Sequence, residues 1–275
     1  MENLKIIKNR IKTVNSIARA TNAMKMVSTV KLTKTNSLNK ALKECCDILF
    51  GMLSQAIGEA RFENCLESDF WTERKDGKTL VIVLSTNQGF CGSFNQAIIC
   101  EAQKIIGSCK EAYVKIFGKK GKVLGVQVDK TEFESNIENL AQDLAKIALE
   151  YIMNRNVTEV IVISSEKKNA ISQIVKQTKI LPIDVKNVIN TRYIEIEGSK
   201  KEFINSVFNT YILKLFKKLI TEHRISELTA RVMATDNVFR NANEISNGLS
   251  FLHNSIRQIK ITQELTEIVA GMECV

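Results

Sequence analysis

The stretch VFRNANEISNGLSFLHNSIRQI, residues 238–259, decides the fold expected for this chain of 275 residues. Its apolar side chains recur in alternating steps of four and three, at Val238, Ala242, Ile245, Leu249, Leu252, Ile256 and Ile259. Such a repeat keeps one apolar stripe facing a partner helix, which is typical of a coiled coil. The stretch therefore predicts a long C-terminal helix that is buried against a second helix.

The expected partner is the N-terminal segment, residues 3–57. The four-and-three spacing recurs at Leu4, Ile7, Ile11, Val14 and Ala18, and the stripe then shifts to Ile17, Ala20, Met24 and Val27. No glycine or proline occurs before Gly51, and the one proline of the chain is Pro182. Because an α-helix rises about 1.5 Å per residue, about 50 residues span roughly 75 Å. A globular domain of this size does not need a helix of that length.

The centre of the chain has the pattern of an α/β domain. Three apolar runs, TLVIVLS (79–85), AYVKIFG (112–118) and TEVIVIS (158–164), predict strands. Helices are predicted over 94–106 and 137–154, so that strands and helices alternate as they do in parallel sheets. The stretch 170–181 fits either a strand or a helix, and RYIEIEG (192–198) alternates like an edge strand.

The boundaries follow from changes in composition. Residues 58–78 are polar and irregular, which indicates a loop. Ser199, followed three residues later by Glu202, has the spacing of a capping box and predicts a helix from about 200 to about 270, with Gly271 at its C-cap. We therefore expect an N-terminal coiled-coil helix over 1–57, an α/β domain over 58–198 and a C-terminal coiled-coil helix over 199–275.

The charge of the chain is unevenly placed. The formal net charge is +9, and residues 1–57 alone carry ten basic and three acidic side chains. A basic helix favours an acidic partner, such as nucleic acid, anionic lipid or an acidic protein, and a solvated face is the plain alternative. No apolar run reaches the length of about 18 residues that a membrane span needs. Seven cysteines without a CxxC pair predict reduced thiols in a cytosol-like compartment.

No catalytic, cofactor or metal site is predicted. The segment TLVIVLSTNQGFCGSFNQ (79–96) has a glycine turn between a strand and a helix, but it matches neither GxGxxG nor a P-loop, so a tight turn is favoured. His223 and His253 lack ligand neighbours and are expected on the surface or in the seam. Asp236 and Glu244 are expected to be isolated, solvated acids.

The tail RQIKITQELTEIVAG, residues 257–271, brings polar and apolar groups close together. The polar ones are Arg257, Gln258, Lys260, Thr262, Gln263, Glu264 and Glu267, and they surround Ile259, Ile261, Leu265 and Ile268. The tail could be the ordinary surface of a coiled coil. It could also be a helix end that is inserted in a partner and meets its polar loops.

Three blocks of the chain resemble the γ subunit, the central rotor shaft, of the F-type ATP synthase. They are RIKTVNSIARATNAMKMVSTVKL (10–32), LSTNQGFCGSFN (84–95), and ATDNVFRNANEIS (234–246) with the tail block 257–271. They occur in the family's order and cover nearly the whole chain. ITQELTEIV, within the tail, is the most specific of these motifs.

The resemblance implies an α/β fold with a long antiparallel coiled coil of the two terminal helices and a central Rossmann-like α/β domain. The coil is expected to penetrate a ring of α and β subunits, with the α/β domain on the membrane rotor (c) ring beside the ε subunit. Catalytic groups belong to β, so this chain is expected to be non-catalytic and without a cofactor. The expected location is peripheral, on the cytoplasmic side of a bacterial inner membrane or on a mitochondrial matrix face, without membrane insertion.

The resemblance also implies contact residues. Met24 and Lys25 face acidic loops of β. Polar contacts near the tip come from Arg257, Gln258, Thr262, Gln263 and Glu264, while Ile268 enters an apolar bearing with Val269 and Ala270. Tyr193 falls in the segment that meets the rotor ring. Two positions depart from the family pattern, because Lys25 stands where an acid is usual and Asn22 where a lysine is usual.

Two other functions are compatible with parts of the sequence. The first is a basic coiled-coil protein that binds nucleic acid, although no groove-reading motif or interleaved aromatic residues support it. The second is a small nucleotide-binding enzyme with helical arms. Salt-sensitive retention on DNA and tight nucleotide binding by the isolated chain would favour the first and the second, respectively.

Overall fold

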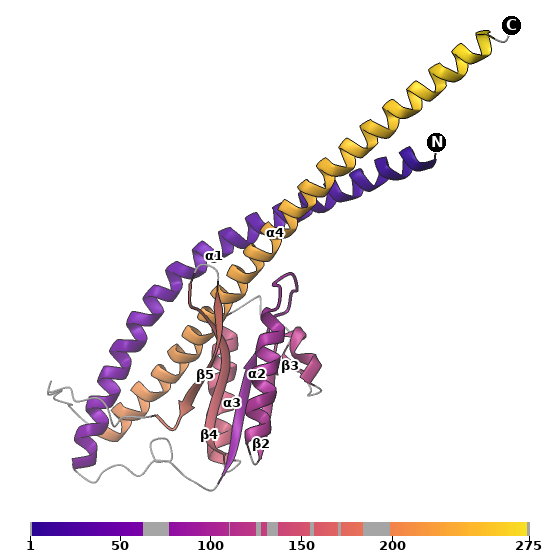
Figure 1. Cartoon of the computed structure of the whole chain (residues 1–275). Coiled ribbons are helices and arrows are strands. Elements are labelled where there is room, and N and C mark those ends of the chain that lie inside the picture. Colours follow the sequence, from indigo (N-terminus) through magenta and orange to yellow (C-terminus); the bar gives the residue numbers. More distant parts are fainter. Residues whose placement is uncertain are drawn as a thin grey trace. The chain divides into compact units, whose positions relative to one another are not determined.

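The computed structural model describes residues 2–62, 77–109, 111–124, 128–130, 137–154, 157–169, 172–183 and 199–273. The chain forms two compact units, which we call the coil unit, Met1–Thr29 with Val232–Val275, and the α/β unit, Val30–Arg231. Helix α1, Glu2–Phe62, and helix α4, Lys200–Glu273, contribute to both units (Figure 1). The two long terminal helices are therefore confirmed.

The helix ends differ in part from the prediction. Helix α1 continues past residue 57 to Phe62, because Leu53 and Ile57 are fully buried in the α/β unit and hold its last turns. The backbone N–H of Glu202 donates to Ser199 Oγ at 3.5 Å, which confirms the predicted start of α4. The prediction of Gly271 as a C-cap is wrong, because α4 runs on to Glu273.

Helix α4 also passes through Gly248 in the coil unit. A Cβ added at Gly248 would meet no atom within 4 Å, so packing does not require a glycine there. Glycine inside a helix is destabilising because its backbone loses more conformational freedom than that of any other residue.

The α/β unit contains one sheet of five strands in the order β3-β2-β1-β4-β5. Its further elements are β1 Lys78–Leu84, α2 Phe94–Ser108, β2 Ala112–Phe117, the short 3₁₀ helix η1 Lys119–Leu124, β3 Val128–Lys130, α3 Ile137–Asn154, β4 Val157–Lys167 and β5 Gln173–Leu181. Strands β1 to β4 are parallel and β5 is antiparallel to β4. The three predicted strands are confirmed, the ambiguous stretch 170–181 contains a strand, and RYIEIEG lies outside the described residues.

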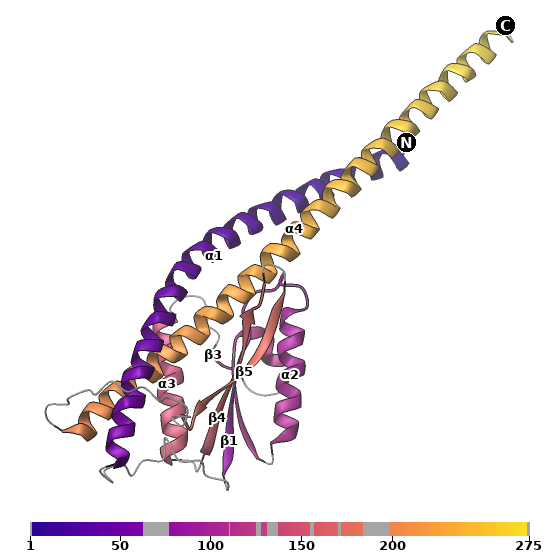
Figure 2. The same cartoon turned by 60° about the vertical axis from the view of Figure 1, so that its left-hand side comes forward.

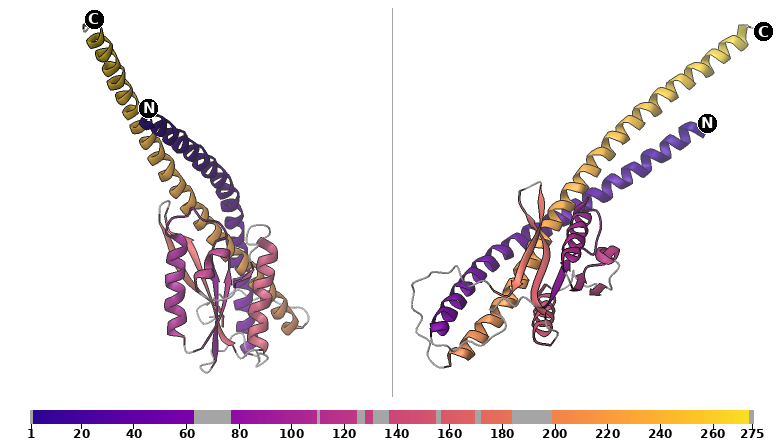
Figure 3. Two further views of the ribbon diagram at one scale, coloured as in Figure 1. Left: turned by 90° about the vertical axis from the view of Figure 1, so that its right-hand side faces the viewer. Right: turned by 60° about the horizontal axis from the view of Figure 1, so that its bottom comes forward.

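The sheet is covered on both faces, which explains the continuous apolar run in β1. Leu80, Ile82 and Leu84 belong to a core shared with α1, α3 and α4. The alternate residues Val81 and Val83 belong to a second core with α2. Figures 2 and 3 show α2 and α3 on opposite sides of the strands. Successive side chains of a strand point to opposite faces, so both sets must be apolar.

In the coil unit α1 and α4 run antiparallel, as Asn15 contacts Ser246 and Lys25 contacts Asp236. The predicted stripe of α1 is confirmed from Leu4 to Ala18. The predicted shift that follows is wrong, because the four-and-three series continues through Thr21, Lys25 and Ser28, which are buried or half-buried. Ile17, Met24 and Val27 are exposed instead.

The seam of α4 differs from the prediction in the same way. The four-and-three series whose members are all buried or half-buried is Thr235, Phe239, Ala242, Ser246, Leu249, His253, Ile256 and Lys260. Ala242, Leu249 and Ile256 were predicted correctly, whereas Val238, Ile245, Leu252 and Ile259 are exposed. The predicted and observed seams share these three positions, and at the others the covered residue lies one position further along α4, as in Phe239, Ser246 and His253. His253 lies in this seam, within the range of the prediction.

Candidate partner interface

The glycine segment after β1 lies where doubly wound domains bind ligands. Such proteins bind at the carboxyl ends of the strands, at the point where the strand order reverses, which is here between β1 and β4. The turn is tight, as Phe90 and Gly92 have φ values of 61° and 60°. Gly118 lies close by, and a Cβ on it would come within 2.5 Å of the Ser85 carbonyl oxygen.

Helix α4 places His223 at this end of the sheet. The side chain is fully buried, and its Nδ1 accepts a hydrogen bond from the Ser165 backbone N–H at 3.3 Å. Its ring lies 5.5 Å from the ring of Phe94 at the start of α2. Burial lowers the pKa of His223 to about 3, helped by the nearby charge of Arg224, so the imidazole is neutral at physiological pH. The prediction of a surface or seam position for His223 is therefore wrong.

One turn further along α4, Glu227 holds two arginines. Its carboxylate is fully buried and pairs with Arg224 and Arg231. Arg231 also donates from Nε to the Gly89 carbonyl oxygen at 3.2 Å and from a terminal nitrogen to the Gln88 carbonyl oxygen. Buried charges require such pairing, because an unpaired one is strongly unfavourable. The network fixes the glycine turn to α4.

Protein side chains thus pack the place where a ligand binds in other doubly wound domains. Thr86 Oγ1 donates to the Gln88 carbonyl oxygen and contacts Asn95 Oδ1, so the polar groups of the turn are used internally. Within the described part of the chain, no three His, Cys, Asp or Glu side chains gather to hold a metal ion. The hydrogen bonds of Thr86 and Arg231 hold the glycine turn in place.

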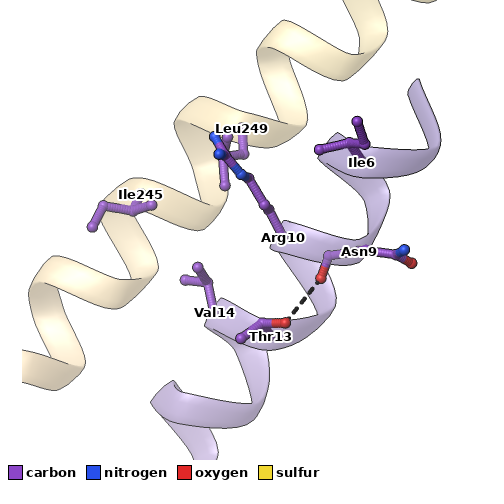
Figure 4. Close-up of a pocket in the computed structure, with 7 residues that line it drawn as sticks. All are labelled: Ile6, Asn9, Arg10, Thr13, Val14, Ile245 and Leu249. Carbon is purple, nitrogen blue, oxygen red and sulfur yellow. Dashed lines mark hydrogen bonds between the residues drawn. The ribbon is translucent and has the colours of Figure 1, made fainter. Parts of the chain in front are cut away.

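The coil unit has a groove along one side of its two helices. It has a volume of about 520 Å³ and is lined by Ile6, Asn9, Arg10, Thr13 and Val14 of α1 and by Ile245 and Leu249 of α4 (Figure 4). Isoleucine, leucine and valine side chains face the space, and the guanidinium of Arg10 reaches across it toward Leu249. The groove is an apolar surface with a cation at its rim.

Basic side chains are also exposed along α1. Lys5, Lys8, Arg10, Lys12 and Arg19 are all exposed in the coil unit. Lys25, which belongs to the same helix, is different. Its Nζ lies 2.6 Å from Asp236 Oδ1, while Arg240 contacts the other carboxylate oxygen at 2.9 Å. The prediction that Asp236 is an isolated, solvated acid is wrong.

Every side chain of the tail from residue 261 to residue 272 is exposed. The pairs Asn15–Ser246 and Lys25–Asp236 define a register in which the start of α1 lies opposite residue 259. Beyond that point α4 has no helix of its own unit beside it. The apolar side chains Ile261, Leu265 and Ile268 are about half exposed or more.

The polar residues predicted for the partner contact lie on this helix end. Thr262 Oγ1 donates to the Gln258 carbonyl oxygen, and Gln263 Nε2 donates to Glu267 Oε1 at 3.1 Å. Lys260 and Glu264 approach within 3.8 Å. Arg257 and Gln258 are exposed, as is Met24 of α1, whereas Tyr193 lies outside the described residues.

Sequence reasoning missed the group formed by His223, Arg224, Glu227 and Arg231. A signal exists, because Glu227 and Arg231 are four residues apart on a helix and could pair. The sequence shows no sign that α4 passes the ends of β1 and β4, and only that path makes the pair buried.

A two-helix coil with this much exposed apolar surface is typical of a subunit in a larger assembly. The chain matches the family model described as ATP synthase over residues 3–275. The chain belongs to the γ-chain family of ATP synthase. In the described residues, no helix has the length and apolar character needed to cross a membrane.

Individual relatives agree with this assignment. The ATP synthase gamma chain of Clostridium kluyveri is 30% identical over 277 residues, which cover 97% of this chain and 96% of the relative. That of Rickettsia prowazekii is 30% identical, with 100% of both chains covered. The family assignment does not support the nucleic-acid-binding alternative.

Solved structures share the fold. A chain in the cryo-EM structure of the Euglena gracilis mitochondrial ATP synthase, with OSCP, F1 and the c-ring, has a TM-score of 0.66 at 16% identity, covering 99% of this chain and 94% of that chain. A chain from the central stalk and c-ring of the Tetrahymena thermophila enzyme has a TM-score of 0.56 at 19% identity, covering 79% and 98%.

Proposed function

We propose that this chain is the central rotating stalk subunit of a proton-translocating F-type ATP synthase. In this role it transmits rotation of the membrane rotor ring to conformational change at the nucleotide sites of the β subunits. The observation that carries the proposal is the exposed tail, residues 261–272, in a chain of the γ-chain family. An apolar surface that its own unit does not cover marks a site of protein contact.

The proposed partners are the α and β subunits around the coil unit and the ε subunit and c-ring at the α/β unit. The relatives that are ATP synthase gamma chains support this, as do the similar chains in structures that contain F1, the central stalk or the c-ring. The exposed bases of α1 suit acidic loops on the surrounding subunits. Exposed ion pairs contribute only about 0–1 kcal/mol each, so they guide the coil without locking it.

The proposed contacts are Met24 on α1, the polar set Arg257, Gln258, Thr262, Gln263 and Glu264 near the tip, Ile268 in an apolar bearing, and Tyr193 toward the rotor ring. A coil with different faces contacts each β subunit differently as it turns. Differential contact shifts the population of open and closed nucleotide sites, and in this way rotation of the coil changes the state of each catalytic site. Catalytic groups belong to β in this proposal, and the proposed domains remain 1–57, 58–198 and 199–275.

The proposed location is peripheral, on the cytoplasmic side of a bacterial inner membrane. Named relatives from Clostridium and Rickettsia support a bacterial setting. Attachment would come from the rotor ring rather than from a segment of this chain.

Reconstitution with α and β subunits tests the proposal. The full chain should co-purify with them and rotate during ATP hydrolysis. Ile268→Asp should weaken this association at least about tenfold, equal to about 1.4 kcal/mol, because it places a charge in the apolar contact. The matched control is Ile174→Asp on β5, where the side chain is also exposed. Failure to co-purify, or equal effects of the two variants, would contradict the proposal.

A further inference from the structure

Lys25 and Asp236 form a charged pair across the two helices of the coil unit. The Lys25 Nζ to Asp236 Oδ1 distance is 2.6 Å, and the side chains are 36% and 21% exposed. Asp236 Oδ2 is held at 2.9 Å by Arg240 on the next turn of α4. Both oxygens of one carboxylate are therefore bound, one from each helix. The hydrogen bond from Lys25 is the main reason why the pKa of Asp236 lies below its usual value, with Arg240 contributing.

We propose that Lys25 and Asp236 are a clasp that fixes the register between α1 and α4, and that Lys25 acts inside the coil rather than on an acidic partner. The seam around them provides little other selectivity. Thr21, Ser28 and Thr235 are small buried side chains that fit several alignments. A charged or polar pair in a coiled-coil seam specifies the alignment, because any other alignment separates the partners.

The sequence of α4 makes the clasp selective. A slip of seven residues would place Lys25 opposite Asn243 or Thr229, and a slip of about one turn would place it near Arg240 or Val232. None of these four residues is acidic. Among these alignments the observed register alone gives the half-buried lysine a carboxylate, and each of the four slips would leave Asp236 without its partner from α1. An ion left without its partner in a partly buried seam is costly.

A second polar pair supports the same register. Ser246 Oγ donates to Asn15 Oδ1 at 2.7 Å, ten residues from Lys25 along α1. This spacing is about 15 Å along the helix. A slip of seven residues would place Asn15 opposite His253 or Phe239. The two pairs agree on one alignment and are far enough apart to oppose local slipping.

Charge reversal in the full chain tests the clasp. Lys25→Glu and Asp236→Lys should each lower the midpoint of thermal unfolding by about 2–4 °C, which corresponds to about 1 kcal/mol for a chain of this size. The double variant should recover more than half of the loss. Lys12→Glu and Glu244→Lys make the same charge changes at exposed positions and should shift the midpoint by less than about 1 °C. Strictly additive losses in the double variant would overturn the clasp.

A cross-link between α1 and α4 measures their register directly. Cysteines at Asn15 and Ser246 should react with a short bifunctional thiol reagent, and the linked peptide identifies the alignment by mass. Lys25→Glu should reduce the yield at least about twofold, and adding Asp236→Lys should restore it. An unchanged yield in Lys25→Glu would show that the pair does not hold the register.

The same variants separate the clasp from a partner contact. If Lys25 acts on an acidic surface of another subunit, the double variant still presents a carboxylate to that surface and stays as defective in rotation as Lys25→Glu alone. If Lys25 acts inside the coil, the double variant recovers rotation. The measurements on the isolated chain do not depend on the proposed stalk function, whose own failure would be seen with the wild-type chain.

Discussion

The coil unit and the α/β unit bury their apolar residues very differently. In the α/β unit large side chains such as Leu80, Leu144 and Phe216 are buried. In the described part of the coil unit, the only buried apolar side chains are those of Ala18 and Ala242. Burial stabilises by about 25 cal/mol per Å² of apolar surface, so the small seam side chains of the coil contribute little.

The difference shows which apolar side chains each unit buries by itself and which it leaves exposed. The α/β unit places its large apolar groups against its own sheet. In the described part of the coil unit, the buried seam residues are small, the larger apolar ones such as Leu249 and Ile256 are half-buried, and Ile17, Met24, Ile245, Leu252 and Ile259 are exposed. A coiled coil that stood alone would be expected to bury the larger set. The coil is therefore built to be completed by other chains, in agreement with the proposed function.

The largest effect is expected when the truncation of a buried apolar side chain is compared with that of an exposed one. Phe216→Ala in the α/β core should lower the free energy of unfolding by about 3–5 kcal/mol, because it leaves a cavity. Ile268→Ala in the exposed tail should change it by less than about 0.5 kcal/mol. Urea denaturation of the isolated chain measures both, and similar losses would mean that the tail is covered within the chain.

A pH series tests the burial of His223 in the α/β unit. Its folded pKa of about 3 lies below the ordinary value of about 6.5, so between these values the unfolded chain binds a proton that the folded chain does not. The stability that depends on the neutral imidazole is complete above about pH 6.5 and is lost as the pH falls toward 3. Between pH 6 and pH 4 the loss should amount to about 2–3 kcal/mol.

His223→Gln serves as the comparison for that series, because glutamine does not titrate. Burial raises the pKa of the neighbouring Glu222 and so acts in the opposite direction. Both proteins retain Glu222, and the difference between their slopes isolates the histidine. Equal slopes for the two proteins would show that His223 is accessible to protons in the folded state.

The register of the coil is tested by two aspartates three residues apart. Ile256 is half-buried in the seam, whereas Ile259 is 63% exposed. Ile256→Asp should lower the free energy of unfolding by about 1–3 kcal/mol, since it places an unpaired charge between the helices. Ile259→Asp should stay within about 0.5 kcal/mol. Comparable losses in the two variants would restore the seam expected from the sequence, which contained both residues.

The smallest expected effect is a gain in stability. Gly248→Ala fits without contact and removes the conformational freedom that glycine has in the unfolded chain. The free energy of unfolding should rise by about 0.5–1 kcal/mol. Thermal unfolding of the full chain measures it, and a loss would indicate a special backbone conformation at this position.

The sequence was sufficient for β1, β2, β4, α2 and α3 and for the existence of both long helices, whereas β3 was not predicted and the stretch that contains β5 was left open between strand and helix. The apolar runs in β1 and β4 are continuous, which indicates buried strands. The spacing of apolar residues in α3 indicates a helix. The seam of the coil could not be assigned in the same way, because large apolar residues at positions such as Ile245 and Leu252 compete with Ser246 and His253 one residue away. Spacing cannot tell which face meets the partner helix and which meets another protein.

The candidate site was predictable as a segment but not in its pairings. The tail from Arg257 to Ile268 was singled out by its composition and by the family resemblance, and it lies on a helix as expected, while its partner contacts stay a prediction. The partner of Lys25 could not be inferred, because Asp236 lies 211 residues away in the sequence. The position of His223 depends equally on the path of α4 past β1 and β4.

Helix α4 is one hydrogen-bonded element from Lys200 to Glu273, and it serves both units without a linker. The residues that connect the two units in this half of the chain are therefore helical throughout. Gly248 is the one glycine of α4 that precedes its last turn, and glycine gives a helix backbone more conformational freedom than any other residue. If the chain stores mechanical energy between successive steps, stiffening that single position should shorten the angular lag between the two ends.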